Sequence, residues 1–173
     1  HTRFLDDAVA IAGRIVEQSD LAELPDSSKN DDREVAVGLG YGGSGVALFF
    51  LYLTIATGND DWATKGRSLL HSDLRHARWN LGRFIGFPER ASKIRKTASV
   101  ASCYLSSGTS GVLSSLVRYA YFFESADDFT LLSRYATDIM KKYTAFPQLN
   151  IGLAGVGNTA LDIFQFTGDS RFL

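Results

Sequence analysis

The sequence predicts an all-α protein: a partial α/α toroid built from about three helical-hairpin repeats. Only three prolines occur in 173 residues, which leaves long windows without a helix breaker. Those windows carry apolar residues at helical spacing. No segment shows sustained period-two alternation, so we expect little or no sheet. The same glycine-containing unit also occurs three times, which is typical of repeat architectures.

The composition is that of a globular protein, with 45% hydrophobic and 21% charged residues. The formal net charge is −1, so we expect neither nucleic acid nor an acidic membrane surface as a partner. The most apolar run, residues 46–56, is too short to span a bilayer, which takes about 20 residues. The single cysteine, Cys103, and the lack of a signal-peptide pattern lead us to expect a cytoplasmic location.

We expect six main helices, separated by turns and two longer connections. Residues 21–36 are polar and predict a mobile surface loop. Residues 80–100 are basic and predict an irregular connection, either a peptide- or phosphate-binding loop or a solvated linker. The expected helices cover residues 3–18, 46–57, 61–79, 112–123, 129–143 and 155–166.

The repeated unit is a Gly-x-x-Gly-Val segment that opens an apolar helix. It occurs in residues 41–46, 107–112 and 151–156. In each copy an aromatic residue follows the first glycine at nearly the same spacing. Gly42, Gly108 and Gly152 precede Trp62, Phe129 and Phe172 by 20, 21 and 20 residues.

Glycine has no Cβ, so the chain can turn sharply and neighbouring backbones can approach closely. We expect free backbone N–H groups at each helix start to point toward a common axis. Apolar inner helices would then form one ring, and amphipathic outer helices would cover it. An open solenoid of helical hairpins is the alternative that the repeat also allows.

These glycine turns resemble the lanthionine synthetase C-like family. The similarity to the cyclase region of class III and IV lanthipeptide synthetases lies in residues 40–53, 56–58, 143–147, 152–157 and 166–169. The resemblance runs from about Val37 to Leu173. It implies a seven-repeat α/α toroid, of which residues 1–173 are a segment of about three repeats. It also implies phosphate-lyase and kinase domains upstream in the same polypeptide.

The activity that the resemblance implies is thioether formation in a ribosomal precursor peptide. A cysteine thiolate of the peptide adds to a dehydroalanine or dehydrobutyrine. Zinc-dependent members of the family bind the metal through two cysteines and one histidine at inner-helix starts. Ser106, Asn150 and Ile151 stand at those positions here, and they do not make a tetrahedral zinc site. We therefore expect no metal, as in class III synthetases, and ATP or GTP only at an upstream kinase domain.

Five residues are candidates for the site. Tyr41 precedes Gly42 where the resemblance implies an acid/base histidine, and a phenol can protonate the enolate left by thiolate attack. Its alternative role is packing on the neighbouring inner helix. The candidates for binding the peptide are Ser106, Ser107, Ser110 and Asn150, whose alternative role is helix N-capping.

Other residues with reactive side chains are interpreted as structural. His71 and His76 lie five apart on an expected outer helix, which does not favour a paired metal site. Cys103 has no identifiable base beside it in the sequence, so we expect a small buried residue. We expect Asp73 and Asp138 to face solvent or to form salt bridges.

The leading hypothesis is therefore the cyclase segment of a class III-like lanthipeptide synthetase that works without zinc. The second hypothesis is a non-catalytic toroid that binds a peptide or a partner domain. An unrelated α/α-toroid enzyme, such as a glycosidase or a terpenoid cyclase, needs paired acidic residues facing the cavity. The inner-helix starts carry none.

Overall fold

The computed structural model describes residues 2–18, 37–88, 101–140 and 144–173, and these are mostly helical. The loop predicted at 21–36 and the second part of the basic connection, 89–100, lie outside the described residues. The helices are α1 (Thr2–Gln18), α2 (Gly43–Thr57), α3 (Asp60–Leu74), α4 (Thr109–Phe122), α5 (Ala126–Tyr135) and α6 (Leu153–Thr167), with 3-10 turns η1 (Ala136–Asp138) and η2 (Ser170–Phe172). The strands are β1 (Arg78–Asn80), β2 (Arg83–Pro88) and β3 (Ala101–Ser102).

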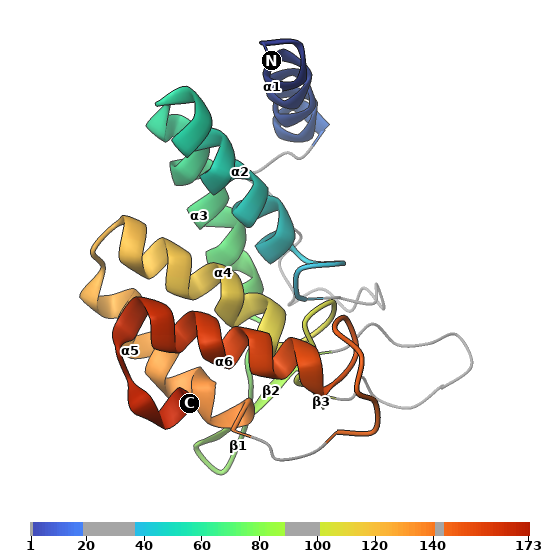
Figure 1. Ribbon diagram of the computed structural model, residues 1–173, viewed down its shortest axis with the longest axis vertical. Helices are drawn as coiled ribbons and strands as arrows, with labels where there is room; N and C mark the ends of the chain where they lie inside the picture. Colours follow the sequence, from blue (N-terminus) through green and yellow to red (C-terminus); the bar gives the residue numbers. More distant parts are fainter. Residues whose placement is uncertain (1, 19–36, 89–100, 141–143) are drawn as a thin grey trace.

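The helices form two layers. Figure 1 shows α2, α4 and α6 following one another in a front layer, with α3 and α5 behind them. The middle helix of the front layer, α4, is the most enclosed, because 11 of its 14 residues are buried. Only 4 of the 15 residues of α6 are buried, since α6 has a front-layer neighbour on one side. In the back layer, α3 has 7 of its 15 residues buried, against 6 of 15 in α2, so the enclosed inner helix that the repeat predicts is clear only at α4.

The hydrophobic core lies between the two layers. Tyr119 of α4 is fully buried there, and its hydroxyl donates a 2.7 Å hydrogen bond to the carbonyl oxygen of Ala47 in α2. The back-layer helices are joined by an ion pair, in which Arg67 of α3 lies 2.6 Å from the buried carboxylate of Asp128 in α5. A smaller apolar cluster attaches α1 to α2 and α3 through Ala12 and its neighbours.

Glycine and asparagine mark several of the helix ends. Gly58 and Gly168 end α2 and α6 in the left-handed conformation, both with φ of 70°, which glycine adopts without steric cost. Asn59 then begins α3, and its side chain accepts a 3.1 Å hydrogen bond from the N–H of Asp61.

A small antiparallel sheet, in the order β1-β2-β3, is the main departure from the prediction. Residues 83–88 form a regular strand, so the predicted irregular connection is wrong there. The alternation of buried and exposed residues covers only 83–86, too short a stretch to stand out in the sequence.

The helices before the sheet and before η1 also end earlier than expected, at Leu74 and Tyr135. Residues 78–80 pair with β2 instead of continuing α3, and Tyr135 at the end of α5 packs against Phe84 of β2 at a centroid distance of 4.7 Å.

Candidate functional site

Each front-layer helix begins directly after the first glycine of its Gly-x-x-Gly pair. The N-cap residues are Gly42, Gly108 and Gly152, which have no side chain of their own to cap the helix. Because glycine occupies all three cap positions, Ser107 and Asn150 are not the N-caps of these helices.

The second glycine of each pair lets the helix pass close to the loop that precedes it. A Cβ atom at this position would collide with a carbonyl oxygen six residues earlier in the chain. The colliding pairs are Gly45 with Leu39, Gly111 with Leu105, and Gly155 with Leu149. The repeat therefore encodes one folded loop that the chain forms three times.

The three loops lie side by side and share backbone hydrogen bonds. Leu39 N–H donates to the carbonyl of Leu105 at 3.1 Å, and Gly40 N–H donates to that of Ser106 at 2.8 Å. Ser106 N–H in turn donates to the carbonyl of Asn150 at 2.9 Å. The middle loop is thus bonded to both of its neighbours, which brings the three repeats together at one end of the front layer.

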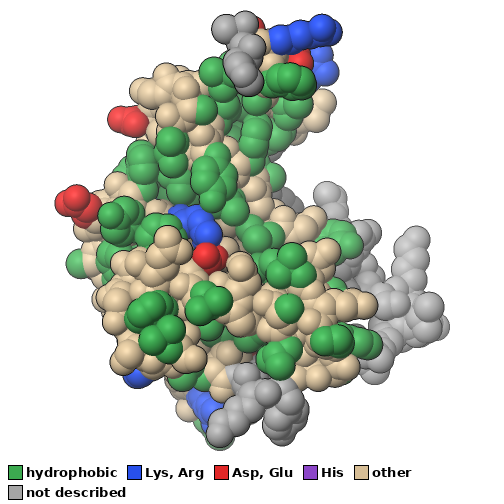
Figure 2. Space-filling view, viewed as in Figure 1, with side chains coloured by type: hydrophobic (Ala, Val, Ile, Leu, Met, Phe, Trp, Pro, Cys, Tyr) green, Lys and Arg blue, Asp and Glu red, His purple; other side chains and the backbone are tan. Residues whose placement is uncertain are grey.

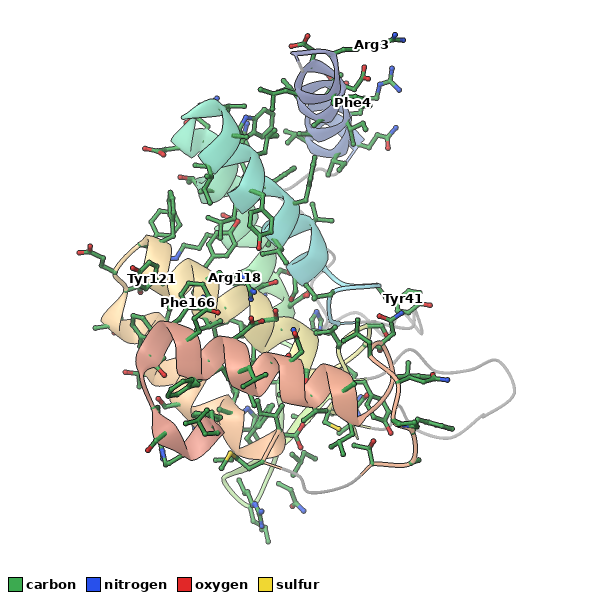
Figure 3. The ribbon with its side chains drawn as sticks, in the orientation of Figure 1. Arg3, Phe4, Tyr41, Arg118, Tyr121 and Phe166 are labelled. Atoms are coloured by element: carbon green, nitrogen blue, oxygen red, sulfur yellow. The ribbon has the colours of Figure 1, made fainter. Side chains whose placement is uncertain are left out.

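A hollow of about 340 Å³ opens where these loops meet, and we call it the loop hollow. Its lining consists of Leu39, Gly40, Tyr41, Leu105, Ser106 and Asn150. Three of the five predicted site residues are therefore brought together. The side chain of Tyr41 is 60% exposed, and Figure 3 shows it at the loop end of the molecule.

The other two predicted site residues lie deeper and are absent from this lining. Ser110 is fully buried, and its hydroxyl donates a 2.5 Å hydrogen bond to the carbonyl of Cys103. Ser107 is 5% exposed, and its buried hydroxyl has no hydrogen-bond partner among the described residues. Cys103 is itself buried, in agreement with the prediction.

The expectation of free N–H groups at the helix starts is wrong for α4 and α6. The first turn of each helix instead donates to carbonyl oxygens seven residues earlier in the chain. These bonds join Ser110 to Cys103 (3.2 Å), Gly111 to Tyr104 (3.4 Å), Leu153 to Phe146 (2.8 Å) and Ala154 to Pro147 (3.3 Å). The loop carbonyl oxygens therefore accept the hydrogen bonds of the first helix N–H groups, so these four amides are not available to bind an anion.

The start of α2 is held by a carboxylate from α3. Asp73 accepts hydrogen bonds from the N–H of Gly43 (3.0 Å), the N–H of Ser44 (2.7 Å) and the hydroxyl of Ser44 (2.6 Å). It is 7% exposed, so the expectation of a solvent-facing or salt-bridged side chain is wrong. Burial raises the pKa of Asp73, against the lowering effect of its bonds to Ser44 and Gly43 and of nearby His76.

Asp138 lies in the matching position at the start of α4. Its carboxylate accepts a 2.6 Å hydrogen bond from the hydroxyl of Thr109, the first residue of that helix. Both contacts have a signal in the sequence, a regular spacing that the predictions above do not use. The two acids follow the first glycines of their repeats, Gly42 and Gly108, by 31 and 30 residues.

A second hollow, of about 610 Å³, lies toward the C-terminal ends of the front-layer helices, and we call it the far hollow. Its lining is largely aromatic and includes Tyr52, Tyr121 and Phe166. Figure 3 shows Arg118, Tyr121 and Phe166 together, well away from Tyr41. Arg118 forms a two-bonded ion pair with Asp162 at 2.8 and 2.9 Å, and Figure 2 shows a basic and an acidic patch side by side on this face.

The residues at the three candidate zinc-ligand positions do not fit the metal. Ser106 offers a hydroxyl, Asn150 an amide and Ile151 a hydrocarbon, none of which is a zinc ligand of the usual kind. Among the described residues, no group of three or more His, Cys, Asp or Glu side chains is arranged to hold a metal ion. In the same part of the chain, no helix has both the length and the apolar character needed to cross a bilayer.

The sequence matches no protein-family model, and no curated protein is significantly similar to it.

Proposed function

We propose that this chain is a segment of a lanthionine-forming cyclase, in which the loop hollow binds the reacting part of a ribosomal precursor peptide. The observation that carries the proposal is the meeting of three glycine turns at one end of the front layer, joined by backbone hydrogen bonds through Ser106. The two helical layers are then an arc of a closed α/α toroid. The upstream lyase and kinase domains that the resemblance implies would supply the dehydrated peptide in the cytoplasm.

The chemistry that fits the loop hollow is a Michael-type addition without zinc. The sulfur of a peptide cysteine thiolate forms a C–S bond to the β-carbon of a dehydroalanine or dehydrobutyrine. The electron pair of the double bond passes to the α-carbon and its carbonyl as an enolate. Tyr41 donates its phenolic proton to the α-carbon and completes the thioether, and its phenolate then takes a proton back from the solvent, which received the proton of the peptide thiol. The thiolate arises without a metal, from the ionised fraction of the peptide thiol.

Ser106 and Asn150 have the groups to orient the peptide beside Tyr41. Both line the loop hollow, and their side chains carry hydrogen-bond donors and acceptors. The backbone N–H of Ser106 is already bonded to the carbonyl of Asn150, so the two residues are held together. In this proposal they bind peptide amides and fix the position of the double bond.

The experiment incubates the full-length polypeptide with its dehydrated precursor peptide and follows the loss of free thiol by cysteine capping and mass spectrometry. We expect thiol loss with the wild type and a decrease of about 100-fold in its rate for Tyr41→Phe, because one proton donor is removed. Tyr52→Phe is the matched control, since Tyr52 is also an exposed tyrosine but lies in the far hollow. Its rate is expected to equal that of the wild type.

Complete capping after incubation, combined with binding of the peptide, would contradict the cyclase and support a toroid that only binds peptides. Equal rates for the wild type and Tyr41→Phe would leave the cyclase standing and remove Tyr41 as the proton donor.

A further inference from the structure

The β1–β2 hairpin is an addition to the repeat. The connection from α3 to α4 has 34 residues, 75–108, whereas the equivalent connection from α5 to α6 has 17, 136–152. The shorter connection reaches the next front-layer helix in the same way, through the same glycine turn. The hairpin is therefore an insertion relative to the shorter connection, although Phe84 and Phe87 of β2 belong to the hydrophobic core. A long connection of this kind usually serves a function.

The tip of the hairpin carries a residue that does not favour folding. Leu81 and Gly82 form the two-residue turn, with φ of 48° and 76°. A turn with two positive φ angles favours Asn or Asp at its first position, because a leucine there is sterically strained. Leu81 is also 100% exposed, so no packing compensates for this strain.

The rest of the hairpin is packed on one side and presents a mixed apolar and basic face on the other. On its inner side Trp79 packs against Phe84, and the guanidinium of Arg134 lies 4.0 Å from the centre of the Trp79 ring. On its outer side Arg83 is exposed and Ile85 is 42% exposed. Residues 75–88 contain three arginines and no acidic residue, although the whole chain has a net charge of −1.

We propose that Leu81, Arg83 and Ile85 form a docking surface for an acidic peptide segment that carries aliphatic side chains. The exposed leucine and isoleucine would pack on those aliphatic groups, and the arginine would pair with carboxylates. A backbone that is already ordered loses little entropy on binding, and this increases the affinity. The proposal is independent of the cyclase reaction, because it concerns a different surface.

The test is fluorescence anisotropy with a labelled 14-residue peptide of Glu, Leu and Ser, compared with the same peptide in which Lys replaces Glu. The acidic peptide is expected to bind at least about tenfold more tightly than the basic one. Leu81→Asn is the decisive variant, because it is expected to weaken peptide binding and at the same time to stabilise the fold. We expect about a tenfold loss of affinity, since one apolar contact is removed, together with a melting temperature about 3 °C higher. Arg83→Glu is expected to lower the affinity for the acidic peptide and to raise the affinity for the basic one.

Leu161→Asn is the matched control, because Leu161 is 56% exposed but lies on α6. Its affinity for the acidic peptide is expected to equal that of the wild type. The proposal is overturned if the acidic peptide does not bind, if both peptides bind equally, or if Leu81→Asn binds as tightly as the wild type. Because Leu81→Asn favours the turn, a loss of binding cannot be ascribed to unfolding.

Discussion

The starts of α2 and α4 share the same Gly-x-x-Gly-Val pattern, yet different groups hold them. In α4 the first amides bond to the chain's own carbonyls seven residues earlier, as in α6. In α2 the amides of Gly43 and Ser44 bond to Asp73, which comes from a different helix. A repeat thus determines where a helix begins, whereas tertiary contacts determine which group satisfies its first N–H groups.

This difference matters for the loop hollow. The turn that carries Tyr41 depends on a carboxylate from α3, and a Cβ on Gly42 would lie 2.6 Å from that carboxylate. The turns that carry Ser106 and Asn150 depend on backbone bonds within their own loops. Changes of charge at Asp73 are therefore expected to affect one side of the loop hollow more than the other.

The largest expected effect is that of Asp73→Ala. This change leaves the buried amide and hydroxyl of Ser44 and the partly buried amide of Gly43 without an acceptor, so we expect the free energy of unfolding to fall by about 3 kcal/mol. Asp138→Ala is the comparison at α4, and a loss of about 1 kcal/mol is expected because its bond to Thr109 satisfies a side-chain hydroxyl, whereas Asp73 satisfies two helix N–H groups. Urea unfolding followed by circular dichroism measures both values. Equal losses would show that the two helix starts do not differ in the way described.

A smaller loss of stability is expected from a substitution at the second glycine of a pair, where the three turns are alike. Gly155→Ala places a methyl group against the carbonyl of Leu149, and we expect a loss of about 2 kcal/mol in the free energy of unfolding. Gly157→Ala, two residues further along α6, meets no atom within 4 Å and is expected to stabilise the helix by about 0.7 kcal/mol. Thermal unfolding of the two variants decides the point, and a stabilising Gly155→Ala would contradict the close approach of helix and loop.

The smallest expected effect is a dependence on pH. Burial raises the pKa of Asp73 in the folded state, so the folded protein holds its proton up to a higher pH than the unfolded chain. The contribution of this group is complete below the unfolded pKa of about 3.9 and decreases as the pH rises through the raised pKa. Asp73→Asn removes the titration and leaves His76 in place. The unfolding free energy of the wild type, measured relative to that of this variant, should therefore decrease as the pH rises. An increase with pH would contradict the raised pKa.

Much of the helical framework was predictable from the sequence, because glycine and apolar spacing are local signals. The six expected helices are present, and Gly58 and Gly168 end two of them while Asn59 begins a third. The hairpin was not predicted, because its strands are short and its stability comes from Tyr135, which is distant in the sequence. Packing of this kind overrides local propensity.

The loop hollow was predictable in part. Tyr41, Ser106 and Asn150 stand beside the repeated glycines, and this position predicts them as site residues. The three turns lie side by side in the structure, and the three residues line one hollow. Ser110 is instead the second residue of α4. Its hydroxyl donates a hydrogen bond to the carbonyl of Cys103, and it does not line the loop hollow. Asp73 was missed because its partners are 29 and 30 residues away in the chain, beyond the reach of any local pattern.

The central claim is that the three glycine turns meet and are joined through Ser106. Its most direct test is nuclear magnetic resonance detection of scalar couplings across hydrogen bonds. The account predicts couplings from the N–H of Gly40 to the carbonyl of Ser106 and from the N–H of Ser106 to the carbonyl of Asn150. Absence of both, in a spectrum that shows the helical couplings of α4, would contradict it.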